Sequence, residues 1–289
     1  MHQLVPRFAI ALTFMSFSSL ADSQNLVGHR GASHDAPENT LAAFNLAWEQ
    51  GADGIEGDFY LSSDGQVVCI HDKDTERTAG VKYVVAKTPF ETLRSLDVGA
   101  WKDPVFKGER IPLLSEVLAT VPEGKYMIVE LKTGPEIVEP AKKVIEESTV
   151  KPEQILFICF NDQTAAECKK QMPHIRCHWL SGYKENKTKQ LKPGVEEVLS
   201  TLHRTHVDGF GSEAKPDHFD AAFLNRLKEG GCKEFHVWTV DDPEVGRFYQ
   251  KFGPWGITTN RPEWLRKQLG IASTSSPSPG KATGGGGTK

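Results

Sequence analysis

The stretch "YMIVELKTGPEIVEPAKKVIEESTVKPEQILFICF", residues 126–160, contains two short apolar runs separated by an amphipathic one. The runs at 126–132 and 154–160 have the length and apolar content of buried strands. Between them, residues 135–147 place apolar side chains three or four positions apart, which predicts a helix. This stretch therefore predicts a strand, a helix and a second strand in succession.

The same alternation extends in both directions, from residue 25 to residue 270. Further strands are predicted at 25–29, 54–61, 175–180, 207–211, 234–240 and 255–259. Further helices are predicted at 39–51, 161–172, 195–205, 218–231, 242–252 and 262–270. Eight strands that alternate with helices predict an α/β protein with the (β/α)8 TIM-barrel fold. A doubly wound open sheet is the alternative, because strand count alone does not exclude it.

One segment interrupts this alternation between the second and third barrel strands. Residues 62–72, "SSDGQVVCIHD", carry an Asp-Gly pair that predicts a hairpin turn. Residues 73–121 are longer than one crossover helix requires. We therefore expect a small insertion here that lies over one mouth of the barrel, where long loops often help to form a site.

The two ends of the chain differ in composition from the rest. Residues 1–21 combine a basic start, an apolar run at 8–17 and small residues at Ser19 and Ala21, which predicts a cleaved signal peptide and a periplasmic or secreted protein. An uncleaved anchor is the alternative, but the run is shorter than the roughly 20 residues that span a bilayer. Residues 273–289 have almost no apolar content and predict a disordered low-complexity tail. The folded domain is expected at 22–272, with no integral membrane segment.

The charge and composition limit the classes of ligand. The 289 residues carry a formal net charge of -4, with 38% hydrophobic and 25% charged residues and no block of Lys or Arg. A protein that binds a nucleic-acid backbone is therefore not expected. An anionic ligand would need local positive charge or a metal ion. The oligomeric state is left open.

The five cysteines are scattered, at positions 69, 159, 168, 177 and 232. An odd number in an exported protein leaves at least one thiol unpaired within the chain. We expect small buried apolar residues, and pairing of Cys168 with Cys177 is left open because these two are close in sequence.

Acidic side chains gather on one face of two predicted strands. Alternation along 54–61 places Glu56 and Asp58 on the same face, where two buried carboxylates repel one another. Glu130 and Lys132 share a face at the end of the next strand. One divalent cation between the three carboxylates, Ca²⁺ or Mg²⁺, would resolve the repulsion. A buried ion pair between Glu130 and Lys132 is the alternative.

Two histidines and an arginine also follow strand-like runs, where the active sites of barrels gather. His29 and His71 are able to take and return a proton near neutral pH. Arg30 can present a planar set of donors to a phosphate. We therefore expect an anionic substrate above the barrel.

Several other polar residues are expected to have structural roles. We expect Glu38 and Asn39 to secure the start of the first helix, and Asp242 to cap the helix at 242–252. Arg261 is expected to begin the final helix. The remaining histidines, His178 and His236 among them, show no metal-ligand spacing and are assigned no role.

Taken in order, these motifs resemble the glycerophosphodiester phosphodiesterase family from about residue 25 to about residue 269. The resemblance rests on "HRG" at 29–31, "PENT" at 37–40, "GAD" at 51–53, Glu56, Gly57 and Asp58, "DG" at 64–65, "HD" at 71–72, "IPLL" at 111–114, "ELK" at 130–132, "VWTVDD" at 237–242 and "ITTNRP" at 257–262.

The resemblance implies a TIM barrel that hydrolyses glycerophosphodiesters to sn-glycerol 3-phosphate and an alcohol. By the same resemblance, Glu56, Asp58 and Glu130 would hold one divalent cation, and His29 and His71 would be the acid/base pair. Arg30 and Lys132 would bind phosphate, while Trp238 and Phe160 would line the substrate pocket. A plain core aromatic is the alternative interpretation of Trp238.

Two other functions remain open from the sequence. A phospholipase D-like relative acting on lysophospholipid or sphingomyelin could use the same barrel, with apolar residues of the insertion near 83–85 and 101–106 as an interfacial surface. A phosphoinositide-specific phospholipase C fits the pattern less well. The other function is that of a non-catalytic exported phosphodiester-binding protein. A site that no longer catalyses a reaction should have lost a metal ligand or a histidine, and this sequence retains all of them. The headgroup of the substrate stays open, and so does the choice between attack by water and attack by a substrate hydroxyl.

Overall fold

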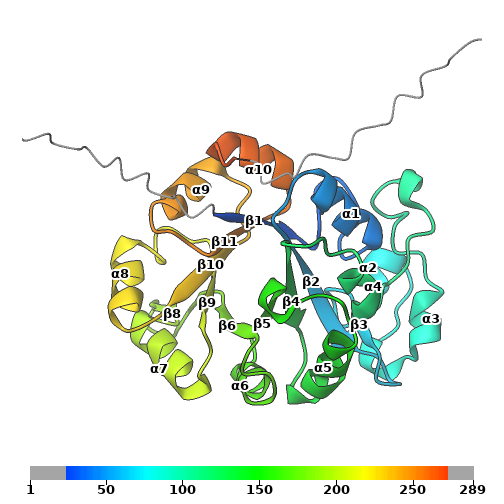
Figure 1. Cartoon of the computed structure of the whole chain (residues 1–289), viewed down its shortest axis with the longest axis horizontal. Helices are drawn as coiled ribbons and strands as arrows, with labels where there is room; N and C mark the ends of the chain where they lie inside the picture. The colour runs from blue at the N-terminus through cyan, green and yellow to red at the C-terminus, as the bar shows by residue number, and fades with distance from the viewer. Residues whose placement is uncertain (1–23, 273–289) are drawn as a thin grey trace, which may run out of the picture.

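The computed structural model describes residues 24–272, which form a closed parallel barrel surrounded by helices (Figure 1). Its strands are β1 (Asn25–His29), β2 (Gly54–Leu61), β4 (Tyr126–Leu131), β5 (Ile155–Cys159), β6 (Arg176–Ser181), β9 (Gly209–Glu213), β10 (Glu234–Trp238) and β11 (Gly256–Thr259). Each strand pairs in parallel with its neighbours, and β1 closes the barrel by pairing with both β2 and β11. The predicted (β/α)8 barrel is confirmed.

A helix lies between each barrel strand and the next, and one more helix follows the last strand. These helices are α1 (Leu41–Glu49), α4 (Leu114–Leu118), α5 (Val138–Glu146), α6 (Asp162–Gln171), α7 (Val195–Thr205), α8 (Ala221–Glu229), α9 (Pro243–Gln250) and α10 (Pro262–Leu269). Two short 3-10 turns, η3 (Pro135–Ile137) and η4 (Pro152–Gln154), flank α5. Asn161, Asp220 and Asp242 cap α6, α8 and α9 by accepting from backbone N–H groups of the first turn, which satisfies donors that a helix start leaves free.

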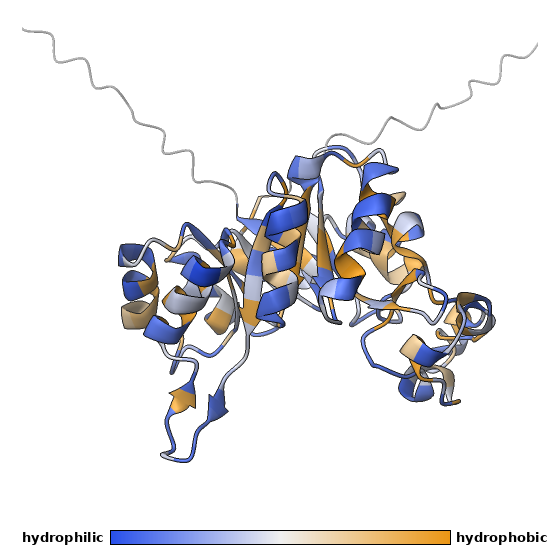
Figure 2. Cartoon of the chain, turned by 90° about the horizontal axis from the view of Figure 1, so that it is seen from below, coloured by the Kyte–Doolittle hydropathy of each residue, from blue (hydrophilic) through white to orange (hydrophobic). Residues whose placement is uncertain are grey.

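The insertion predicted between the second and third barrel strands is present. It begins with β3 (Val67–Cys69), which pairs antiparallel with β2, and continues through α2 (Glu76–Ala79), η1 (Val85–Lys87), α3 (Phe90–Arg94) and η2 (Pro104–Phe106). A small apolar cluster of its own, which includes Val85, Leu93 and Ile111, holds it against β3. Figure 2 shows this segment projecting to the lower right.

A second excursion was not predicted. Residues 184–192 form a hairpin of two short strands, β7 (Lys184–Glu185) and β8 (Leu191–Lys192), which projects at the lower left of Figure 2. Its sequence is polar throughout except for Leu191, so no alternation of apolar and polar residues marks it as strand. The hairpin and the insertion project from the same side of the barrel.

The barrel strands sort their side chains by alternation. Outward-facing apolar residues pack against the helices, whereas Val27, Ile128, Leu156, Ile158 and Leu180 fill the interior. The last inward positions of each strand therefore lie at the carboxyl-terminal mouth, where TIM-barrel sites form. None of the helices in residues 24–272 is both long and apolar enough to cross a bilayer.

The predicted signal peptide, residues 1–21, and the predicted tail, residues 273–289, lie outside the described residues. The five cysteines lie within residues 24–272 and are free thiols. The disulfide between Cys168 and Cys177, which the sequence left open, is therefore not formed in this structure.

Candidate active site

A pocket of about 100 Å³ lies at the carboxyl ends of the barrel strands. It is lined by His29, Arg30, Glu56, His71, Glu130, Lys132, Ile158, Phe160, Leu180, His236, Trp238 and Thr258. All the site residues expected from the sequence line it except Asp58, which lies beneath at 1% exposure. A larger open groove, lined by residues such as Lys228, Phe235 and Phe252, lies elsewhere and contains none of these side chains.

Three carboxylates meet on neighbouring strands, as the alternation predicted. Glu56 and Asp58 come from β2 and Glu130 from β4, and the parallel register pairs Asp58 with Glu130. One oxygen of each carboxylate lies within 4.8 Å of the others, and all three residues are buried. This is an oxygen-only donor set of the kind that Ca²⁺ and Mg²⁺ prefer.

Two of the three carboxyl groups have raised pKa values. Burial and the neighbouring Asp58 charge raise the pKa of Glu130 to about 7. Burial, Asp58 and Glu130 raise the pKa of Glu56 well above its usual range, and its Oε1 is buried without a hydrogen-bond partner among the described residues. An orphaned buried carboxylate oxygen is costly, and a bound cation would satisfy it.

Arg30 and Lys132 provide the positive charge. Burial alone would raise the pKa of Asp58, but Lys132 at 3.1 Å and Arg30 Nε at 3.2 Å lower it well below its usual range. Lys132 also contacts Glu130 at 2.6 Å. Both cations line the pocket, so they can contact a phosphate as well as the carboxylates.

The turn after β1 places Arg30 by a close approach of backbone segments. The Arg30 N–H donates to Glu56 Oε2 at 2.9 Å. Gly31 follows with φ +82, and a Cβ there would lie 2.5 Å from the carbonyl group of Ala43. Only glycine fits both conditions, which explains the glycine of "HRG".

His29 is held by a chain of side chains from the far end of the sequence. Its Nδ1 lies 2.7 Å from Oδ1 of Asn260, whose own amide nitrogens donate to Asp241. These donations leave Oδ1 of Asn260 as an acceptor, so the network assigns the His29 proton to Nδ1 and the lone pair to Nε2. Burial and the Arg30 charge lower the pKa of His29 to about 4, so the imidazole is neutral at pH 7.

His71 has a different neighbour. Its Nδ1 lies 2.8 Å from Asp72 Oδ1, and Asp72 also accepts from Arg77 Nε at 2.6 Å. Burial would raise the pKa of Asp72, but hydrogen bonds from Arg77 and His71 lower it. Asp72 is therefore an anion that orients the His71 ring through Nδ1.

The two predicted aromatic residues form one wall of the pocket. The rings of Phe160 and Trp238 meet edge to face with centroids 5.5 Å apart. Phe160 follows β5 and is 45% exposed, an unusual exposure for a large apolar ring. The Trp238 Nε1–H is buried without a hydrogen-bond partner among the described residues, so it can donate to a ligand oxygen.

The interpretation of Glu38 and Asn39 as helix-start residues was wrong. Thr40 caps α1 instead, accepting from Ala43 N–H at 3.2 Å. Asn39 donates to Asp58 Oδ2 at 2.8 Å and accepts from the Asp58 N–H at 3.1 Å, so it orients a candidate metal ligand. Glu38 accepts from Arg30 at 2.9 Å. The sequence signal was their place in the loop directly after "HRG".

Two further histidines lie inside the barrel. His178 and His236, which were assigned no role, stack with centroids 5.1 Å apart and share a hydrogen bond of 2.8 Å between their Nδ1 atoms. Burial and the His178 neighbour lower the pKa of His236 well below its usual range. His236 reaches the pocket as its floor, while His178 lies behind it.

Known proteins are similar to this chain in sequence and in fold. Residues 29–264 match the glycerophosphoryl diester phosphodiesterase family. A glycerophosphodiester phosphodiesterase of Caldanaerobacter subterraneus subsp. tengcongensis is 33% identical over 247 residues, which cover 83% of this chain and 95% of the relative. An Oleispira antarctica phosphodiesterase, solved in complex with the product sn-glycerol-3-phosphate, has a TM-score of 0.75 and 25% identity over 86% of this chain and 98% of that chain. A Thermotoga maritima glycerophosphodiester phosphodiesterase, at 24% identity and TM-score 0.67 over 84% of this chain and 97% of that chain, shows the same fold.

The barrel, its mouth and these similarities define a phosphoric diester hydrolase on a TIM barrel. Because the family match spans residues 29–264 and the relative above is similar over nearly its whole length, the chain belongs to the glycerophosphoryl diester phosphodiesterase family. The resemblance carried by the motifs is thereby confirmed.

Proposed function

We propose that this protein hydrolyses glycerophosphodiesters to sn-glycerol 3-phosphate and an alcohol, depends on one divalent cation and uses His29 and His71 as its acid/base pair. The observation that carries the proposal is that both histidines, Arg30 and Lys132 meet at one pocket with three carboxylates. We call these carboxylates, of Glu56, Asp58 and Glu130, the acidic trio. The product bound by the Oleispira antarctica relative supports the same substrate class.

Phosphate would be held by positive charge on one side of the pocket. Arg30 can present two parallel N–H donors to phosphate oxygens, and Lys132 adds a compact charge beside Phe160, its Nζ 6.0 Å from the ring centroid. A divalent cation held by Glu56, Asp58 and Glu130 would polarise a phosphoryl oxygen. Arg30 and Lys132 then stabilise the negative charge that grows on phosphate in the transition state.

His29 has the features of the general base. Its pKa of about 4 keeps it neutral at pH 7, and the Asn260 hydrogen bond leaves the Nε2 lone pair free. Nε2 therefore takes the proton of the attacking group, which is water or the neighbouring hydroxyl of the glycerol moiety.

His71 has the features of the general acid. The Asp72 carboxylate lies 2.8 Å from Nδ1 and orients the ring, so a proton on Nε2 is the one available to the pocket. As the phosphorus–oxygen bond to the headgroup breaks, that oxygen takes the His71 proton and leaves as a neutral alcohol. After attack by water, proton transfer from His29 to His71 restores the pair. After attack by the hydroxyl, water opens the resulting cyclic phosphate, with His71 now taking a proton and His29 returning one.

The test uses purified protein and glycerophosphocholine. The protein is stripped with EDTA and resupplied separately with Ca²⁺ and Mg²⁺, while sn-glycerol 3-phosphate and free choline are assayed together. We expect metal-restored release of both in equal amounts. Release that is unaffected by EDTA would contradict the cation requirement, and no release from a folded protein would contradict the substrate class.

A lipid substrate is the second candidate, because apolar side chains lie exposed on the insertion. Tyr83, Trp101 and Val105 are 39%, 42% and 77% exposed. Trp101 lies 5.8 Å from the Arg77 guanidinium, which pairs with Asp72 beside His71. Choline release from lysophosphatidylcholine or sphingomyelin, exceeding that from glycerophosphocholine, would favour this candidate.

We also propose that the protein is exported, on the basis of residues 1–21. The test expresses the full chain and determines the amino-terminal sequence of the protein recovered from the periplasm or medium. A mature protein that begins at Asp22 is expected. Recovery in the cytoplasm with Met1 retained would contradict the proposal.

A further inference from the structure

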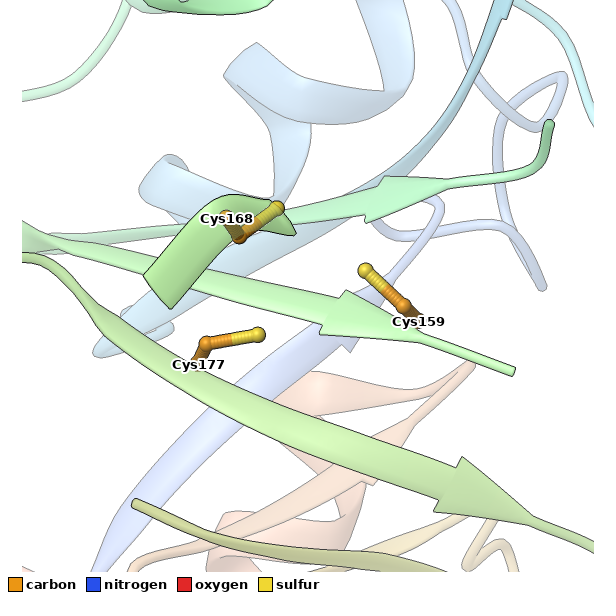
Figure 3. A group of neighbouring side chains, drawn as sticks. All are labelled: Cys159, Cys168 and Cys177. Carbon is orange, nitrogen blue, oxygen red and sulfur yellow. The ribbon is translucent and has the colours of Figure 1, made fainter. Parts of the chain in front are cut away.

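Three of the five cysteines meet in one buried cluster away from the pocket (Figure 3). Cys159 lies at the end of β5, Cys177 lies on β6, and Cys168 lies on α6, which covers both strands. The three sulfurs all lie within 4.8 Å of one another, and each residue is at most 1% exposed. We call these three residues the thiol cluster.

The thiol cluster lies on the outer side of the barrel wall. Strand alternation directs Ile158 and Phe160 toward the pocket, so Cys159, between them, faces α6. Cys177 faces the same way, because the β5–β6 register pairs it with Phe157, two residues before Cys159. The surroundings are apolar, including Ala165, Met172 and Ile175. The cluster therefore has no part in the chemistry of the mouth.

The separations are short enough for a three-coordinate metal site. Sulfurs bonded at about 2.3 Å to one metal ion in a plane lie roughly 4 Å apart. Every pair of these sulfurs is separated by no more than 4.8 Å, so one ion can reach all three, and the ligands come from three separate elements.

The donor set selects the class of cation. The group contains sulfur ligands only, with no His, Asp or Glu from residues 24–272. Hard cations such as Ca²⁺ and Mg²⁺ prefer oxygen, and structural zinc is almost always four-coordinate. Soft thiolates without a fourth ligand favour Cu⁺.

We propose that Cys159, Cys168 and Cys177 form a three-coordinate binding site for Cu⁺. Because a thiolate rather than a thiol is the metal ligand, binding displaces three protons, and three thiolates around one Cu⁺ leave a net charge of two minus. No electron is transferred, because the copper enters as Cu⁺. Since the sulfurs are sealed from solvent, the ion enters before α6 packs on the strands, and once bound it links α6 to β5 and β6.

The experiment purifies the full chain under reducing, oxygen-free conditions from cells grown with added copper. Copper per chain is counted after dialysis against a Cu⁺ chelator, and thiols are counted by alkylation in denaturant with and without that chelator. Cys168→Ser and Cys159→Ala remove one ligand each. Cys232→Ser is the matched control, because Cys232 is half-buried and lies outside the thiol cluster.

We expect one copper per chain in the wild type and in Cys232→Ser, with near-ultraviolet charge-transfer absorption and a raised Tm. Both cluster variants should lose the copper, the absorption and the added Tm. No retained copper in the wild type, equal copper in the cluster variants, zinc in place of copper, or a disulfide within the thiol cluster would each overturn the proposal.

Discussion

His29 combines a lowered pKa with a fixed tautomer, and both depend on side chains remote in sequence. Replacing His29 with alanine removes the base while leaving the barrel wall intact. We expect kcat to fall by about 10² to 10⁴-fold, the usual contribution of a general base. Turnover of glycerophosphocholine, with circular dichroism as the check on folding, measures the effect.

The chain offers a matched control in the same loop. His34 is 52% exposed and pairs with Asp35 at the surface, so His34→Ala should leave kcat within about two-fold of the wild type. Full activity in His29→Ala would remove His29 from the acid/base pair.

Asn260 is a positioning residue for His29. Its hydrogen bond raises the pKa of His29 against the larger lowering by burial. Asn260→Ala should therefore lower that pKa further and move the acid limb of the kcat profile to lower pH, with kcat reduced about ten-fold and KM little changed. Asn260→Asp adds a negative charge and should move the same limb to higher pH. An acid limb of the kcat profile at the same pH in the wild type, Asn260→Ala and Asn260→Asp would contradict this role.

At the scale of elements, caps contribute to stability independently of catalysis. Asp220 accepts from the Phe223 N–H at 2.8 Å and begins α8, and it does not line the pocket. Asp220→Ala should lower the free energy of unfolding by about 1 kcal/mol, and Asp220→Asn should restore most of it. Urea unfolding measures both, and kcat should not change. Equal stability of all three proteins would show that the cap contributes nothing.

The barrel strands could be predicted because each has a local signal. Buried runs such as 155–159 are continuously apolar, and helix starts such as Asn161 and Asp242 carry capping side chains. The same alternation placed Glu56, Asp58 and Glu130 together, because their strands are neighbours. Local periodicity therefore predicted the fold and much of the candidate site.

The remainder depends on contacts between distant segments. Asn260 lies 231 residues from His29, and Asn39 reaches Asp58 across 19 residues. No spacing rule links such pairs, so Asn39 was misread as a helix-start residue. The hairpin at 184–192 was missed for another reason, since its polar strands carry no period-two pattern.

At the scale of the whole molecule, two of the three buried carboxyl groups, those of Glu56 and Glu130, oppose folding at neutral pH when no cation is bound. A carboxyl whose folded pKa is raised contributes stability that is present below its unfolded pKa and lost as pH rises through the folded value. For Glu130 that loss runs from about 4.5 to about 7 and is on the order of 3 kcal/mol. His29 acts oppositely, since its lowered pKa reduces stability as pH falls from 6.5 toward 4.

A divalent cation should therefore stabilise the protein in a pH-dependent way. Below pH 5 the cation must displace protons from Glu130 and Glu56, whereas near pH 8 Glu130 is already ionised. We expect the rise in Tm on adding Ca²⁺ or Mg²⁺ to be small at pH 5 and several-fold larger at pH 8. Glu56→Gln relieves repulsion, so it should raise the metal-free Tm and abolish most of the cation-induced rise. A cation-induced rise that is equal at both pH values, or unchanged in Glu56→Gln, would remove the acidic trio as the site of binding.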